Sequence, residues 1–253
     1  MRRLIINADD FGFTRDVNEG IVHAHREGVL TSTTLMANGD AFDDAVRLAK
    51  QTPTLDIGAH LVLVQGNSLL EGRPLPETPR QLLAVLARGG LNVYGELKAQ
   101  IEKIRASGIH ISHLDSHKHT HLVPSVFQAV VKLAGEFGIT WVRLPLDTTI
   151  RLGKPLTAAG NLYYRWRGPN VKFTDHFLGF HLTGSLSEEK LARALSQLEG
   201  GVTEFMCHPG YLGEELKKSR TRLKESRLIE LEALTSPRIR QIIAEKGIQL
   251  GPF

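Results

Sequence analysis

The chain has 253 residues, of which 42% are hydrophobic and 23% charged, a composition typical of a globular protein with a substantial core. Its net charge of +4 comes without a broad basic stripe interleaved with aromatic residues, which argues against nucleic acid as a partner. No apolar run approaches ~18 residues, no leader precedes the first predicted strand, and Cys207 is a lone cysteine, so we expect a cytoplasmic protein without a transmembrane segment.

Short apolar runs alternate with helical patterns along most of the chain. The predicted strands are Leu4–Ala8, Ser32–Met36, Ile57–Val62, Ile109–Leu114, Trp141–Leu144 and Glu204–Cys207. The predicted helices are Val17–Glu27, Ala41–Gln51, Gly95–Ser107, Pro124–Phe137 and Ser187–Leu198. Left-handed caps are expected at Gly28, Gly108 and Gly138. This alternation predicts an α/β fold with a parallel sheet, either a barrel or doubly wound, and residues 1–253 are predicted to form a single domain.

Two stretches interrupt the alternation. Residues 64–81 are rich in Gly and Pro and predict a long loop directly after a strand. Residues 144–170 predict a second irregular insertion, which ends in a cluster of aromatic residues and arginines. Long loops of this kind often serve as functional lids. A basic run at residues 217–227 is predicted to be a solvated helix face.

The first predicted strand ends at two adjacent carboxylates, Asp9 and Asp10. Neighbouring side chains of a strand point in different directions, and adjacent carboxylates raise each other's pKa unless a positive group lies between them. Paired acids after a strand also occur at the start of a helix, and the segment DDFGFTRD fits that alternative.

Histidines gather at the ends of other predicted strands. The segment HISHLDSHKHTH continues the alternation of a strand and places on one face His113, Asp115, His117, His119 and His121. His60 lies inside an apolar strand, where a core histidine is the alternative, and His208 ends another strand before a Pro-Gly turn. The His-rich segment also fits a surface tract with weak metal affinity. In a barrel these strand ends meet at one rim, where imidazoles and one carboxylate would bind a catalytic divalent metal and the second carboxylate would face its water.

Six segments, in this order, resemble the successive blocks of the YdjC-like carbohydrate deacetylases: NADDFG, TSTTLMANG, IGAHLVL, HLDSHKHTHL, VRLP and MCHPGY. This family is similar in site chemistry to the NodB-type polysaccharide deacetylases, which implies a deformed (β/α) TIM-like barrel. By this resemblance Asp10, His60 and His117 match the metal ligands. Asp9 matches the general base and His208 the general acid.

The resemblance implies roles for further residues. Arg143 is similar to the arginine that pairs with the base, and an ordinary surface arginine is the alternative. His119 and His121 are expected to support the ligands or contact the sugar, with packing as the alternative. The aromatic residues expected to stack on a sugar or lipid, or else to form core or homodimer contacts, are Tyr163, Tyr164 and Trp166.

The resemblance implies hydrolysis of the N-acetyl group of an amino sugar, with one divalent metal ion. Ligand chemistry suits Zn²⁺, and the resemblance allows Mg²⁺. Residues 174–191 look closer to relatives that act on acetylglucosaminyl hopanoid lipids than to those that act on chitin oligosaccharides, so oligosaccharide and glycolipid both stay open. The rivals are a metal-dependent glycosidase or phosphoesterase on the same barrel and a non-catalytic protein that binds sugar or metal. With Asp9 ionised and His208 protonated, the rate is expected to show a bell-shaped dependence on pH.

Overall fold

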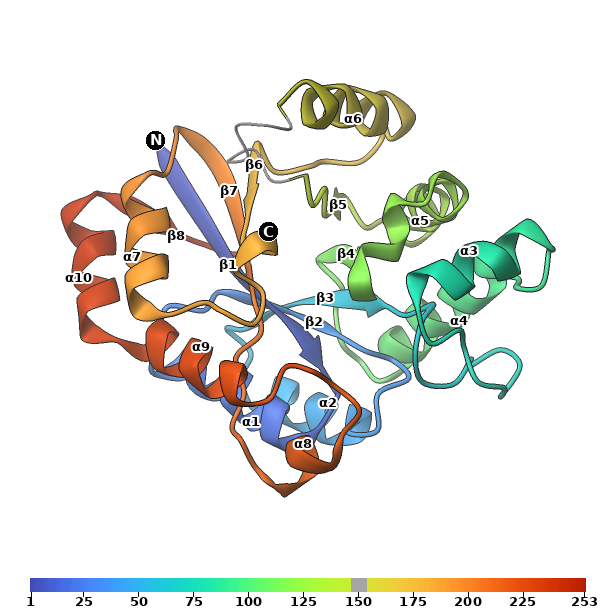
Figure 1. Cartoon of the computed structure of the whole chain (residues 1–253), viewed down its shortest axis with the longest axis horizontal. Coiled ribbons are helices and arrows are strands. Elements are labelled where there is room, and N and C mark those ends of the chain that lie inside the picture. Colours follow the sequence, from blue (N-terminus) through green and yellow to red (C-terminus); the bar gives the residue numbers. More distant parts are fainter. Residues whose placement is uncertain (147–153) are drawn as a thin grey trace.

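The computed structural model describes residues 1–146 and 154–253, whose strands form one parallel sheet. The strands are β1 (Arg2–Phe11), β2 (Ser32–Leu35), β3 (Asp56–Leu61), β4 (His113–Ser116), β5 (Trp141–Val142), β6 (His176–Leu178), β7 (Gly201–Cys207) and β8 (Ile248–Leu250). Their order is β5-β4-β3-β2-β1-β7-β6, and β8 pairs with the first residues of β1 (Figure 1). The sheet is curled, and in the described residues an isolated bridge links Trp141 of β5 to Lys172, which precedes the other edge strand, β6. The predicted deformed barrel is confirmed as an open one.

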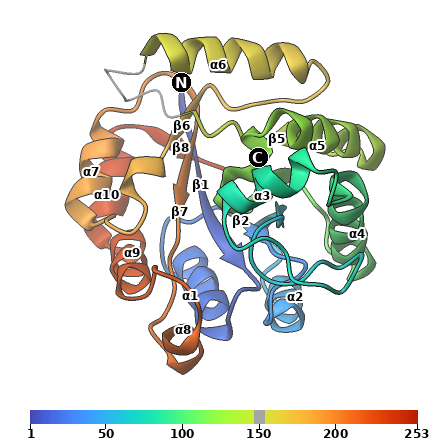
Figure 2. The ribbon, with the colours of Figure 1, turned by 45° about the vertical axis from the view of Figure 1, so that its right-hand side comes forward.

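Helices lie around the outside of the curled sheet (Figure 2). They are α1 (Arg15–Arg26), α2 (Phe42–Lys50), α3 (Pro79–Ala87), α4 (Val93–Ala106), α5 (Pro124–Phe137), α6 (Lys154–Arg167), α7 (Glu188–Ser196), α8 (Glu214–Lys218), α9 (Glu225–Thr235) and α10 (Pro237–Glu245). Short polar side chains begin several of them, as where the Ser187 hydroxyl accepts from the backbone N–H of Lys190. The described part of the chain contains no helix that is both long and apolar enough to cross a membrane.

Strand β1 lies at the centre of the sheet and of the core. Its residues Leu4, Ile5 and Ile6 are fully buried, as expected for a parallel strand covered on both faces. It pairs with β7 along Arg2–Ala8 and with β2 from Asn7 onwards. The acidic pair at its end is therefore placed by the most extensively paired strand of the sheet.

Several predicted elements differ from the structure. The strand predicted at Ile109–Leu114 is β4, which begins at His113, because its pairing with β5 starts at His113 and its pairing with β3 at Leu114. Residues 64–81 form a loop only up to α3, and residues 144–170 include α6. Residues 147–153 of that second insertion lie outside the described part of the chain.

Of the three glycines expected to be left-handed caps, two are confirmed. Gly108 has a φ of +83° and Gly138 a φ of +70°. Gly28 is not left-handed, so that prediction was wrong. A Cβ on Gly28 would lie 2.5 Å from the carbonyl oxygen of Leu234, and glycine is required there because the end of α9 approaches the backbone closely.

Candidate active site

The carboxyl ends of the strands surround a cavity of about 540 Å³. Asp9 and Asp10 reach it from β1, and His60 reaches it from β3. His117 follows β4 directly, at the start of a 3₁₀ turn, and His208 follows β7. The rim of the barrel thus brings together all five residues for which the sequence predicted a metal or proton-transfer role.

A bulge at the end of β1 turns both aspartates into the same cavity. The pairing with β2 shifts register between Ala8 and Phe11, and Asp10 has a φ of +72°. In a regular strand the two side chains would point to opposite faces, and a bulge re-aims one of them. The alternative of a helix cap is wrong, because the Thr14 hydroxyl accepts from the N–H of Val17 and begins α1.

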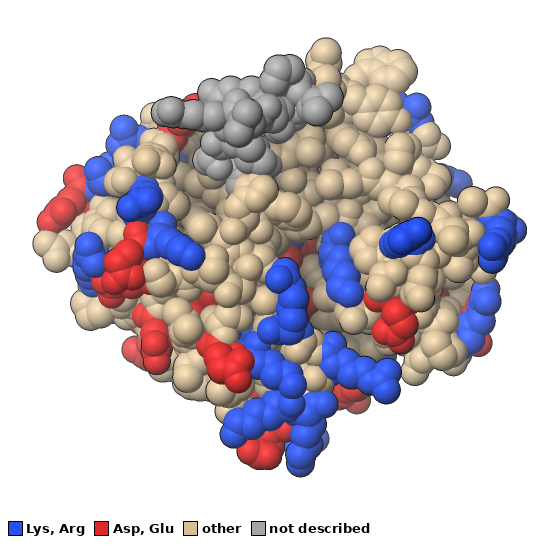
Figure 3. All heavy atoms as spheres, in the orientation of Figure 1, with Lys and Arg blue, Asp and Glu red and all other residues tan. Residues whose placement is uncertain are grey.

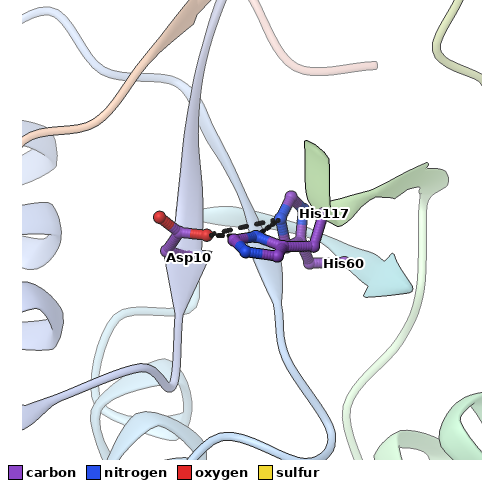
Figure 4. Close-up of side chains that lie close together, drawn as sticks. All are labelled: Asp10, His60 and His117. Carbon is purple, nitrogen blue, oxygen red and sulfur yellow. Dashed lines mark hydrogen bonds and ion pairs between the residues drawn. The ribbon is translucent and has the colours of Figure 1, made fainter. Parts of the chain in front are cut away.

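Three side chains offer one ligand atom each to a common point (Figure 4). Asp10 Oδ1 lies 3.4 Å from His60 Nε2 and 3.1 Å from His117 Nδ1, and the two ring nitrogens are 3.3 Å apart. Neighbouring ligands lie about 3.4 Å apart around a tetrahedral Zn²⁺ and about 3.0 Å apart around an octahedral Mg²⁺. The separations and the mixed nitrogen and oxygen donors fit a divalent ion.

His60 is held in this orientation by a buried carboxylate. Its Nδ1 lies 2.7 Å from Asp115 Oδ1, and the Thr34 hydroxyl donates to the other oxygen of Asp115 at 3.1 Å. A second group of potential ligands is formed by Asp9, His60 and Asp115. Arg143 is bound to both of those aspartates and would repel a cation, so the group with Asp10 is the better metal site.

Metal binding is expected to strengthen as pH rises. Burial lowers the pKa of His60, but Asp115 and Asp10 outweigh burial and raise that pKa to about 10 in the metal-free chain. Below that pH the ring carries a proton that it must lose to bind a metal. Calorimetry in buffers of different ionisation enthalpy should show about one proton released per ion, with affinity rising up to about tenfold per pH unit between pH 7.5 and 9. A flat affinity over this range would contradict the assignment of His60.

Arg143 is fully buried and joins three carboxylates, so the alternative of a surface arginine is wrong. It donates two hydrogen bonds of 2.7 Å to Asp9, and contacts Asp115 and Glu204 at 2.6 Å each. Burial raises the pKa of Asp9, yet the charge and hydrogen bonds of Arg143 outweigh burial and hold that pKa well below its usual range. Asp9 is therefore ionised at neutral pH.

The basic run at residues 217–227 is not one solvated helix face. Residues 219–224 form a loop between α8 and α9, and lysines and arginines gather over this region (Figure 3). Arg220 and Arg222 line the cavity, whereas Arg227 is only 1% exposed. Arg227 donates to Asp10 Oδ2 at 2.5 Å, which leaves Oδ1 facing the two histidines.

His208 faces the other aspartate. Its Nε2 lies 4.0 Å from Asp9 Oδ2, and its backbone N–H donates to Glu230 at 2.6 Å. Burial outweighs the attraction of the two aspartates and lowers the pKa of His208 to about 4. In the metal-free chain His208 is thus neutral at neutral pH, which differs from the protonated state expected from the sequence because that expectation did not include burial.

Most of the chain matches the model of a known protein family. A family model described as YdjC-like protein matches residues 3–245. The chain belongs to this family. Carbohydrate deacetylases of Brevibacillus brevis and Geobacillus stearothermophilus are 35% and 36% identical to it, over 99% and 98% of this chain and 98% and 96% of theirs. A solved structure from Enterococcus faecalis V583, described as a candidate cellobiose-phosphate cleavage protein, matches with a TM-score of 0.82 and 29% identity, covering 99% of this chain and 97% of that one.

In the YdjC-like chain, the residues predicted to contact the sugar lie in different environments. His119 lines the cavity. His121 is fully buried and bonded to the Ser116 hydroxyl and the Arg143 carbonyl, away from the cavity wall. Tyr163 and Trp166 lie on α6, 36% and 71% exposed, and neither belongs to the cavity lining. Of this set, His119 alone is placed to touch a bound molecule in the cavity.

Several polar residues of the YdjC-like site were not assigned a role from the sequence. Asp115 lies inside the segment DSHKHTH, so its closeness to the histidines was the available signal. Arg227 and Glu230 lie in α9, more than 200 residues after the aspartates, where nothing local sets them apart from surface residues. Gln65 lies in the first long loop, next to the cavity.

Proposed function

We propose that this protein is a metal-dependent carbohydrate deacetylase that hydrolyses the N-acetyl group of an amino sugar and releases acetate. The observation that carries the proposal is the pairing of a metal-ligand group with a separate carboxylate and imidazole in one cavity. The named activity of the relatives from Brevibacillus and Geobacillus supports it.

Asp10, His60 and His117 would hold the divalent ion, for which we propose Zn²⁺ or Mg²⁺. When bound, such an ion polarises an acetyl carbonyl and makes the attacking water more acidic. Asp9 lies beside this group and accepts the proton of that water. The low pKa of Asp9 makes it a weak base, so its task depends on an acidified water, while Arg143 keeps it ionised and fixed in direction.

The departing amine needs a proton, because an amide nitrogen is a poor leaving group without one. His208 is neutral at rest, so the proton that it delivers must come from the reaction. Asp9, whose Oδ2 lies 4.0 Å from His208 Nε2, is the group that supplies it. We therefore propose that one proton moves from water to Asp9, then to His208 and finally to the sugar nitrogen.

The cavity has room for a sugar. Its volume of about 540 Å³ is within the usual range for small-molecule sites, and a second hollow of about 510 Å³ shares Gln65, His117 and Arg220 with it. We propose an acetylated oligosaccharide or glycolipid as the substrate, with its acetylated unit beside the ligand group.

Release of acetate tests the proposal directly. The metal-free chain should release none from N-acetylated oligosaccharides or glycolipids, and addition of one equivalent of Zn²⁺ or Mg²⁺ should start the release because the ligand group is then filled. Acetate would be measured enzymatically, with EDTA as the reversal control. New reducing ends or inorganic phosphate without acetate would instead indicate a glycosidase or phosphoesterase. Tight sugar binding without turnover in saturating metal would indicate a non-catalytic protein.

A further inference from the structure

Four residues other than glycine have a left-handed backbone in the described part of the chain: Asp10, Gln65, Lys118 and His119. All four line the same cavity. A side chain with a Cβ is disfavoured in this conformation, and such residues cluster at functional sites, where the surroundings hold them. Asp10 belongs to the ligand group, and Lys118 and His119 directly follow His117 in the chain. Gln65, with a φ of +65°, has no role in the proposed reaction.

The side chain of Gln65 contacts His117 at the ring nitrogen that does not face the other ligand residues. Its Oε1 lies 3.1 Å from His117 Nε2, on the side of the ring opposite Nδ1. His117 Nδ1 faces Asp10 Oδ1 at 3.1 Å. When an ion takes the Nδ1 lone pair, the proton of the ring lies on Nε2, where the Gln65 carbonyl oxygen accepts it.

His60 shows the same arrangement with its nitrogens exchanged. Asp115 Oδ1 lies 2.7 Å from its Nδ1, and its Nε2 faces the ligand group. Each of the two histidines therefore has its own oxygen acceptor on the far side of the ring, a carboxylate for one and an amide for the other. Acceptors of this kind fix the tautomer and orientation of histidines that bind metals.

We propose that Gln65 is a positioning residue of the metal site, whose amide oxygen holds His117 with the Nδ1 lone pair aimed at the ion. This inference rests on the proposed function, since it requires His117 to be a ligand. The loop that begins at residue 64 would therefore help to build the metal site, whereas long loops of this kind often serve as lids.

The loop is braced so that it presents Gln65 in this position. The Gln65 N–H donates to the Pro76 carbonyl at 2.8 Å, and the Leu75 N–H donates to the Gly66 carbonyl at 2.9 Å. Buried Glu96 on α4 accepts from the Ser68 hydroxyl and from the N–H groups of the next two residues. Because these bonds involve backbone and Glu96, substitution of the Gln65 side chain should leave the loop in place.

The test compares three variants of the full chain, Gln65→Ala, Gln65→Gly and Gln65→Glu, by competition for Zn²⁺ with a chelator. Loss of an outer acceptor typically weakens metal binding about 10–100-fold, which we expect for the alanine and glycine variants. Glu retains an oxygen acceptor, so its variant should bind Zn²⁺ at least as tightly as the wild type. Gln241→Ala, an exposed glutamine on α10, is the matched control and should change nothing.

Two further readouts separate positioning from a structural role. Glycine tolerates the left-handed backbone, so the metal-free Gln65→Gly variant should melt no lower than the wild type although it binds Zn²⁺ more weakly. Long-range ¹H–¹⁵N spectra of the Zn²⁺-loaded chain should show a slowly exchanging proton on His117 Nε2 in the wild type and in Gln65→Glu. In the Zn²⁺-loaded Gln65→Ala variant this proton should exchange faster with solvent, because its acceptor is gone.

Wild-type Zn²⁺ affinity in Gln65→Ala, together with metal loss in His117→Ala, would overturn the role of Gln65 and leave the proposed function standing. A raised KM with unchanged Zn²⁺ affinity in Gln65→Ala would also overturn it, and would make Gln65 a substrate contact. Retention of metal by His117→Ala would overturn the proposed metal site itself.

Discussion

Replacement of His60 or His117 by alanine is expected to remove the bound metal and abolish acetate release while the chain stays folded. Each ring supplies one of the three atoms of the proposed ligand group, and no neighbouring described side chain offers a replacement atom to the same group. Stability should persist in His60→Ala because Asp115 still pairs with Arg143 at 2.6 Å, so no buried carboxylate loses its only cation. Elemental analysis of the purified variants measures the metal, and circular dichroism with thermal unfolding measures the fold.

The matched control for these variants is His110→Ala, an exposed histidine in the same segment as His117. It should keep metal, activity and melting temperature. If His60→Ala and His117→Ala both retained one equivalent of metal, the assignment of the ligand group would fail.

The two neighbouring aspartates are expected to respond differently to the same change. Asp9→Asn keeps the shape of the side chain but cannot accept a proton, so the rate should fall by roughly 10²–10⁴ while metal affinity changes little. Asp10→Asn should instead weaken metal binding strongly, because Oδ1 of Asp10 faces both histidines of the proposed ligand group. Arg143 keeps Asp115 and Glu204 as partners in Asp9→Asn, so this variant should fold.

This comparison needs kcat at saturating metal and an independent metal titration for both variants. Asp43→Asn, on the exposed face of α2, controls for loss of a carboxylate as such. A parallel loss of rate and metal affinity in Asp9→Asn and Asp10→Asn would contradict the separation of base from ligand.

The alternation of strands and helices was sufficient for a parallel α/β sheet, and the resemblance to the YdjC-like family for the barrel and for the side chains that meet at its rim. Apolar runs and helix caps placed most strands and helices of the first two thirds of the chain. Histidines at strand ends marked the rim, since parallel strands put their carboxyl ends together. The strands β6 and β8 are only three residues long and carry no clear alternation, so their pairing depends on neighbours distant in the sequence.

The polar partners behind the site were harder to predict for a physical reason. Whether Arg227 is a solvated or a buried arginine depends on the packing of α9 against the barrel, which a basic run in the sequence does not reveal. Strand alternation also failed beyond Ser116, where β4 ends and Lys118 and His119 turn left-handed. This is why His119 reaches the cavity while His121 points into the protein.

The contribution of α9 also limits how far the chain can be shortened. A fragment that ends before residue 225 would retain every proposed ligand, Asp10 included. It would lose Arg227, whose guanidinium donates to the Asp10 carboxylate. It would also lose Glu230, which accepts from the backbone of His208, and the last strand, which pairs with β1. A buried carboxylate without its cation is strongly destabilising, by about 3–5 kcal/mol. The conspicuous sequence motifs all precede residue 212. The catalytic domain nevertheless needs the chain up to β8 to hold its site together.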